Sequence, residues 1–103
     1  MANMGIGTWA MGGPFFDGTQ AVGWGPTDDE ESARALRRAV ELGVNLFDTA
    51  DVYGTGHAEE LPRAGLRGRR DEIRIATKWG NTFDSATRQM TGGDGSVAYM
   101  RRR

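Results

Sequence analysis

Cysteine is absent from the 103-residue sequence, which also has only one histidine, His57, and one lysine, Lys78. Without thiols the chain has no disulfide, no thiol nucleophile and no thiolate metal ligand, and one histidine alone does not form a metal cluster. We therefore expect no metal site, since any such site would have to consist of carboxylates alone.

The chain also lacks a charge excess and a long apolar run. Its 13 basic and 14 acidic side chains give a net charge of -1. No positive field is available to hold a phosphate backbone, which argues against nucleic acid as a partner. No apolar run approaches the roughly 20 residues that span a bilayer, and residues 1–5 lack the features of a secretory signal. We expect no membrane partner and a cytoplasmic location.

Glycine is abundant, with 16 residues gathered mostly in the stretches 5–25 and 92–95. Such stretches are typical of loops between regular elements. We therefore expect loops over residues 10–26 and 79–98.

An amphipathic helix is predicted between Thr27 and Gly43. Thr27 and Glu30 have the spacing of a capping box, and Gly43 suits the end of a helix. The apolar stripe predicted to face the core consists of Ala33, Leu36, Ala39 and Val40. A second helix is expected over residues 58–66, frayed or starting late because Pro62 removes an amide from it.

Three strands are expected, over residues 4–9, 44–48 and 72–77. Strands that alternate with helices through short connections are typical of right-handed βαβ units. The predicted fold class is therefore α/β with a parallel sheet. Residues 99–103 suit the first turn of a further helix.

Three side chains with acid–base chemistry lie at or near the predicted strand ends. Asp48 ends the second strand, Lys78 follows the third, and Tyr53 lies five residues after Asp48. The carboxyl ends of parallel strands share one edge, so the three should meet there. A tyrosine with a free pKa of about 10 becomes a better proton donor beside an ammonium, which favours the phenolate. The alternative is a structural ion pair beside an unrelated tyrosine.

The stretches Gly5–Trp9, Gly43–Gly54 and Ile75–Gly80 resemble consecutive signatures of the aldo/keto reductase superfamily. The resemblance is strongest to its bacterial stress-protein-like and potassium-channel β-subunit-like branches. It implies that the chain is the N-terminal part of a (β/α)₈ TIM barrel. A complete barrel needs about 250 residues and eight strands, whereas three are expected here. Residues 1–103 would then be one partial, truncated domain.

The resemblance also implies roles for individual residues. Tyr53 would be the general acid, tuned by Lys78 and Asp48, while NADPH supplies hydride to a small aldehyde or ketone. The nicotinamide end of the cofactor would be lined by Gly7, Thr8, Trp9 and Asp48. Three loop aromatics are interpreted as walls of an apolar substrate pocket: Trp24, Trp79 and Phe83.

Two other features are interpreted as unrelated to the chemistry. Gly5, Gly7 and Ala10 fit a relaxed dinucleotide fingerprint, but the following residues do not open the helix that this motif needs. His57 lies in the Tyr53 loop and is expected on the loop surface.

Three further functions stay open at this point: a cofactor-binding regulatory subunit or non-catalytic fragment, a Schiff-base aldolase using Lys78, and a small flavodoxin-like binding domain. Three strands of a barrel would leave two open edges and one uncovered apolar face. We therefore expect the isolated chain to be inactive, poorly folded and prone to self-association.

Overall fold

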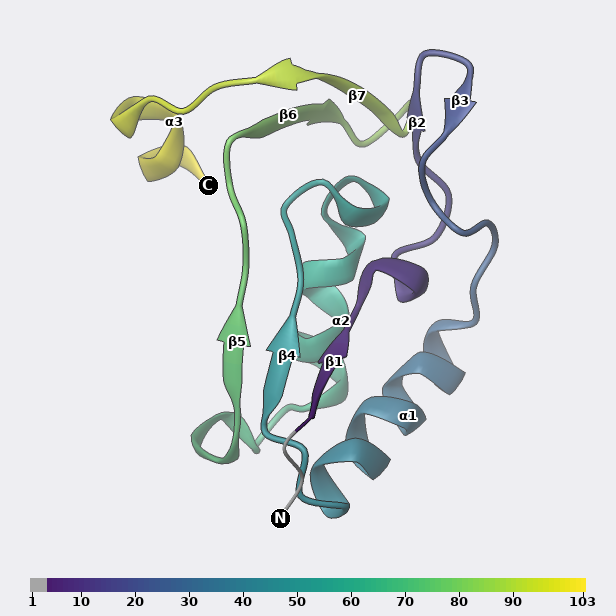
Figure 1. The fold of residues 1–103 in the computed structure, drawn as a ribbon, viewed down its shortest axis with the longest axis vertical. Helices are drawn as coiled ribbons and strands as arrows, with labels where there is room; N and C mark the ends of the chain where they lie inside the picture. The colour runs from purple at the N-terminus through teal and green to yellow at the C-terminus, as the bar shows by residue number, and fades with distance from the viewer. Residues whose placement is uncertain (1–3) are drawn as a thin grey trace.

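The computed structural model describes residues 4–103, which form two sheets and several helices (Figure 1). The first sheet is parallel and has the order β1-β4-β5. Its strands are β1 (Gly5–Gly7), β4 (Leu46–Asp48) and β5 (Arg74–Ala76). The register aligns Gly7 with Asp48 and Asp48 with Ala76. The predicted α/β class and parallel sheet are confirmed, although each strand is shorter than expected.

Two helices, α1 (Asp29–Glu41) and α2 (His57–Gly65), pack against each other and cover one face of this sheet (Figure 1). Alternation along β4 separates the two faces, since Phe47 is fully buried whereas Leu46 is 43% exposed. The buried cluster between sheet and helices consists of Leu36, Ala39, Val44, Phe47, Leu61, Leu66 and Ile73. Within residues 4–103, no helix covers the opposite face of the sheet, on which Leu46 lies.

The start of α1 differs by one residue from the prediction. Asp28 is the N-cap, and its carboxylate accepts hydrogen bonds from the backbone N–H groups of Glu30 and Glu31. The Thr27 hydroxyl instead donates to the carbonyl oxygen of Met11. The expected cap at Thr27 is therefore wrong, because that hydroxyl is used to fasten the preceding loop. Gly43 follows the helix with a φ of 93°, as its predicted role requires.

The expectation of a frayed or late second helix is also wrong. α2 begins at His57, one residue before the expected start, and continues through Pro62. Ala58, Leu61 and Pro62 are all buried, so tertiary packing outweighs the missing amide. The short 3₁₀ turn η2 (Tyr53–Gly56) leads directly into the helix.

The predicted loops contain a second, four-stranded sheet. It pairs two hairpins, in the order β3-β2-β7-β6. In Figure 1 this sheet lies across the end of the molecule toward which the strands of the first sheet point. The purely loop-like interpretation of residues 10–26 and 79–98 is therefore wrong. The strands are β2 (Phe16–Asp17), β3 (Gln20–Ala21), β6 (Asn81–Asp84) and β7 (Gln89–Gly93).

Short helical segments complete the described part of the chain: η1 (Trp9–Met11), η3 (Arg70–Glu72) and α3 (Val97–Arg102). The Ser96 hydroxyl accepts a hydrogen bond from the Tyr99 N–H and caps α3, which agrees with the helical turn expected there. Across residues 4–103, no helix has both the length and the apolar character needed to cross a membrane.

Candidate active site

An ion pair joins the ends of two neighbouring strands at the carboxyl edge of the parallel sheet. The Lys78 Nζ lies 2.9 and 3.1 Å from the two carboxylate oxygens of Asp48 and donates to the Thr49 carbonyl at 2.9 Å. Both charged side chains are about half exposed. The hydrogen bond to Asp48 raises the pKa of Lys78 above its ordinary value of 10.5 and outweighs desolvation, which lowers it, while the charges of Tyr53 and Asp48 add to the increase. The lysine is therefore held in its charged form.

Backbone hydrogen bonds beyond the strand ends explain why these groups meet. The ladder between β4 and β5 continues from the Thr49 N–H to the Ala76 carbonyl at 2.8 Å. On the other side, Thr8 donates to the Asp48 carbonyl through its N–H at 2.9 Å and through its hydroxyl at 3.2 Å. Thr8 is fully buried, so its side chain holds β1 against β4 at the edge that presents the Asp48 carboxylate.

Tyr53 lies beside this ion pair and is part of an aromatic cluster. The Lys78 Nζ is 5.3 Å from the centre of the Tyr53 ring. Trp9 stacks on that ring with centroids 5.6 Å apart and planes inclined by 10°, and Trp24 meets Trp9 edge-on at 6.1 Å. The Trp9 indole N–H donates to the Val22 carbonyl, which fixes the indole in place. The predicted acid, lysine and tyrosine are thus brought together at one rim.

The turn after Tyr53 requires glycine. Gly54 has a φ of 60°, and a Cβ built there would overlap the carbonyl oxygen of Gly12. Glycine adopts this left-handed conformation without steric cost and allows the two backbones to touch. The close approach presses the Tyr53 loop against the loop after β1, which also bears Trp9.

The other predicted site residues are divided between two places. Trp24 lies in the aromatic cluster but is 71% exposed. Phe83 lies in β6, under the Arg103 guanidinium at 4.7 Å, and lines a different cavity of about 440 Å³. Trp79 is 45% exposed, and within residues 4–103 no ring stacking connects Trp79 or Phe83 to the cluster around Tyr53. The role of these three aromatics as walls of one substrate pocket therefore stays a prediction.

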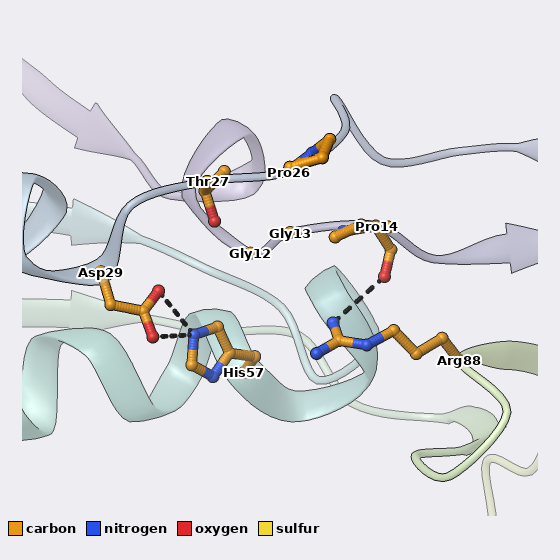
Figure 2. Close-up of a pocket in the computed structure, with 8 residues that line it drawn as sticks. All are labelled: Gly12, Gly13, Pro14, Pro26, Thr27, Asp29, His57 and Arg88. Carbon is orange, nitrogen blue, oxygen red and sulfur yellow. Dashed lines mark hydrogen bonds and ion pairs between the residues drawn. The ribbon is translucent and has the colours of Figure 1, made fainter.

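A separate polar cavity of about 290 Å³ lies between the starts of the two helices (Figure 2). His57 begins α2, and its Nε2 lies 2.8 and 2.9 Å from the carboxylate oxygens of Asp29 at the start of α1. The histidine side chain is 28% exposed and belongs to the first turn of α2, so its expected place in a loop is wrong although the side chain stays partly at the surface. Opposite it, the Arg88 guanidinium donates to the Pro14 carbonyl at 3.2 Å.

This cavity does not coincide with the ion pair and the tyrosine. Its lining includes neither Asp48, nor Tyr53, nor Lys78. The His57–Asp29 contact joins the first turns of the two helices, which gives it a clear structural role.

One residue of the site was missed from the sequence. Asp51 is only 2% exposed, and its carboxylate accepts hydrogen bonds from the backbone N–H and the side-chain amide of Asn81. The available signal was that Asp51 is the only charged residue between Asp48 and His57. No local signal identified Asn81, because its contact depends on how two loops meet.

The parallel sheet with its two helices is a segment of a βα-barrel fold. The family profile of the aldo/keto reductase family matches residues 3–102, and the chain belongs to this family. The chain is 38% identical over 79 residues to the aldo-keto reductase YhdN of Bacillus subtilis (strain 168), a match that covers 75% of this chain and 22% of the relative. It is 40% identical over 86 residues to the chloroplastic pyridoxal reductase of Arabidopsis thaliana, covering 74% and 22%.

Comparison with solved structures also finds aldo-keto reductases. The holo form of an aldo-keto reductase from Bacillus halodurans superposes with a TM-score of 0.75 at 31% identity, covering 96% of this chain and 28% of that one. An aldo-keto reductase from Klebsiella pneumoniae in complex with NADPH superposes with a TM-score of 0.51 at 29% identity, covering 71% and 22%. The chain thus spans about a fifth of the length of the curated relatives it matches. Its parallel sheet corresponds to part of their fold, which rules out the flavodoxin-like alternative.

Proposed function

We propose that this segment supplies the proton-donating side of an NADPH-dependent reductase that converts aldehydes or ketones to alcohols. The observation that supports this proposal most directly is the Lys78–Asp48 ion pair beside the Tyr53 ring. Membership of the aldo/keto reductase family, a family of oxidoreductases, agrees with this proposal. We assign Tyr53 as the general acid, Lys78 as its cationic neighbour and Asp48 as the anchor of Lys78.

The proposed step needs a proton at the carbonyl oxygen of the substrate. The Tyr53 hydroxyl gives its proton to that oxygen, and negative charge develops on the phenol oxygen as the proton leaves. A nearby ammonium stabilises this charge. Asp48 keeps Lys78 charged and oriented through both carboxylate oxygens. The Trp9 ring, stacked on Tyr53, limits the movement of the phenol.

The residues at the rim fit the nicotinamide end of the cofactor. Gly7 ends β1, and a Cβ built at this position would meet no atom within 4 Å, so the backbone there is open to a flat ring. The half-exposed Asp48 carboxylate on the next strand is an acceptor for an amide N–H. We propose that Gly7, Trp9 and Asp48 contact the nicotinamide end of the cofactor. The buried Thr8 supports this surface through its hydrogen bonds to the Asp48 carbonyl. NADPH, when bound, supplies hydride to the substrate carbon.

Two relatives support the choice of chemistry. The Klebsiella pneumoniae structure contains NADPH, and the Arabidopsis thaliana relative is a pyridoxal reductase. Pyridoxal is an aldehyde, so both descriptions agree with carbonyl reduction. We leave the substrate of this protein at the level of a small aldehyde or ketone. We retain the exposed Trp24 and Trp79 as candidate substrate contacts, together with Phe83.

The aldolase alternative conflicts with the state of Lys78. Schiff-base formation needs a neutral amine, which aldolases obtain by lowering the pKa of the lysine. Here the contact with Asp48 raises the pKa of Lys78. Trapping of Lys78 by borohydride in the presence of a carbonyl compound would favour the aldolase. The other alternative, a regulatory subunit, predicts that the protein binds NADPH but does not oxidise it when an aldehyde is added.

The decisive experiment uses a chimera in which residues 4–103 replace the matching segment of the Bacillus halodurans protein. We expect this chimera to oxidise NADPH in the presence of a reactive aldehyde. Replacing the phenol, Tyr53→Phe, should lower kcat by about 100-fold or more, the size expected for loss of a general acid. The matched control, Thr91→Val, removes a hydroxyl of β7 and should leave kcat unchanged. Equal rates in the Tyr53→Phe and Thr91→Val chimeras would refute the assignment of Tyr53.

A further inference from the structure

The loop that bears Tyr53 and the loop that bears Lys78 are joined at one buried point. Asp51 lies two residues before Tyr53, and Asn81 lies three residues after Lys78. The Asn81 N–H donates to Asp51 Oδ2 at 3.0 Å, and the Asn81 side-chain amide donates to Oδ1 at 2.8 Å. Both carboxylate oxygens of Asp51 are thus satisfied by a single residue of the other loop.

Two further hydrogen bonds hold this junction. The backbone N–H of Asp51 donates to the Lys78 carbonyl at 3.1 Å, which extends the β4–β5 ladder into the loops. The Tyr99 hydroxyl donates to the Asn81 carbonyl at 2.6 Å and fastens Asn81 to α3. Asn81 is therefore fixed through its N–H, its carbonyl and its side chain.

A carboxylate at position 51 matches the two donors of Asn81. An ionised carboxylate accepts both hydrogen bonds as the Asn81 side chain stands, whereas an asparagine would need the Asn81 amide to turn over and present its oxygen. Asp51 is 2% exposed, and a buried carboxylate without partners is strongly destabilising. Its two contacts therefore keep the loops together, because separating them would leave the charge without a hydrogen bond.

We propose that Asp51 and Asn81 form a clamp that holds Tyr53 at its distance from Lys78, and that both are positioning residues for the proton transfer. This inference rests on the proposed function for its catalytic consequence, but the clamp itself is a property of these loops. Neither side chain needs to touch the substrate. Their effect is to keep the phenol and the ammonium in one fixed arrangement.

The test exchanges the two side chains. Asn81→Asp places carboxylate against carboxylate and breaks the side-chain contact of the clamp. Asp51→Asn alone can keep that contact, because the Asn81 amide can turn over and present its oxygen to the new NH₂ group. The double variant, Asp51→Asn with Asn81→Asp, restores the side-chain contact with donor and acceptor reversed, and the backbone N–H of residue 81 still donates. Simple loss of stability from each substitution would add in the double variant, whereas a clamp predicts recovery.

The first measurement uses the 103-residue chain at low concentration and needs no activity. Lys78 is the only lysine, so lysine-selective isotope labelling gives one set of signals. We expect nuclear Overhauser contacts between the Lys78 side chain and the Tyr53 ring in the unsubstituted chain and in Asp51→Asn, their loss in Asn81→Asp and their return in the double variant. Thr91→Val, which removes the hydrogen bond between Thr91 and Thr82, is the control and should keep the contacts.

The second measurement is made in the chimera. Asn81→Asp should lower kcat by about tenfold to a hundredfold with little change in the KM for NADPH, since misplaced groups lose rate more than binding. The double variant should recover most of kcat. If Asn81→Asp fails to fold, Asn81→Ala takes its place, because it removes the side-chain contact without adding a buried charge.

The outcomes separate this inference from the proposed function. Overhauser contacts that persist in Asn81→Asp, that do not return in the double variant or that are absent from the unsubstituted chain would overturn the clamp. Contacts that follow the expected pattern in the 103-residue chain, together with a chimera that oxidises no NADPH, would support the clamp and refute the proposed function.

Discussion

The charge state of Lys78 is the feature on which the proposed chemistry depends at the scale of single residues. Its pKa is raised mainly by the hydrogen bond to Asp48. A raised pKa means that the stabilisation from this pair is fully present below the ordinary value of 10.5 and is lost as the pH rises through the folded-state value above it. The ammonium is therefore charged at every pH at which the proposed reductase would work.

A titration of this lysine tests the contact. Asp48→Asn should move the pKa of Lys78 downward, because it removes the strongest of the interactions that favour the charged form. Nuclear magnetic resonance of the lysine ε-carbon follows the titration directly, since the chain has no other lysine. Asp17→Asn, at the exposed end of β2, is the matched loss of a carboxylate and should leave the titration in place. Identical midpoints in the two variants would mean that the ion pair does not form.

At the scale of elements, hydrogen bonds outside the regular structure decide where each element begins. Asp28 rather than Thr27 caps α1, because the Thr27 hydroxyl is bonded to the Met11 carbonyl.

In the second sheet, β2 and β7 are held together by one aligned pair, Phe16 with Gln89, and by contacts such as that from the Gln89 amide to the Gly18 carbonyl. These contacts join loops that follow different strands of the first sheet.

The cap at Asp28 can be tested against the sequence-based alternative. Asp28→Ala should destabilise the first turn of α1 by about 1 kcal/mol, the usual effect of losing an N-cap. The amide hydrogens of Glu30 and Glu31 should then exchange faster with solvent, because both donate to the lost carboxylate. Thr27→Ala should leave these two amides protected, since it removes only the contact with Met11. If the amides of Glu30 and Glu31 exchanged faster only in Thr27→Ala, Thr27 would be the N-cap instead.

At the scale of the whole molecule, the parallel sheet has helices on one face only. β1 and β5 are its edges, and Leu46, on the face opposite the helices, is 43% exposed. Parallel sheets are normally covered on both faces, and open edges invite pairing with other chains. We propose that the isolated chain associates with itself through this face and these edges.

Association of the isolated chain can be measured by sedimentation velocity over a range of concentrations. We expect the average mass to rise with concentration and the thermal transition followed by circular dichroism to be broad. Leu46→Glu should reduce the association, because it places a charge on the uncovered face. Leu42→Glu, at the exposed C-cap of α1, is the control and should not. A sharp, cooperative transition in a monomer at all concentrations would contradict this proposal.

Much of the architecture could be predicted from local patterns. The spacing of apolar residues predicted α1, and the runs around Phe47 and Ile75 predicted two strands of the parallel sheet. The second sheet could not be predicted in this way. Its strands β2 and β3 have two residues each, too few to show an alternating pattern, and their pairing depends on a hairpin about 70 residues away.

The sequence by itself determined the order of strands and helices and the presence of Asp48 and Lys78 at two strand ends, because hydrophobic periodicity and strand length are local properties. Only the tertiary structure decided that the Tyr53 ring stacks on Trp9 beside Lys78, that His57 bonds to Asp29, and that Asp51 is buried against Asn81. Each of these contacts joins segments whose approach is set by backbone pairing and by the close contact of Gly12 with Gly54. Side-chain chemistry can be read along the chain, whereas distances between loops arise only when the sheet has formed.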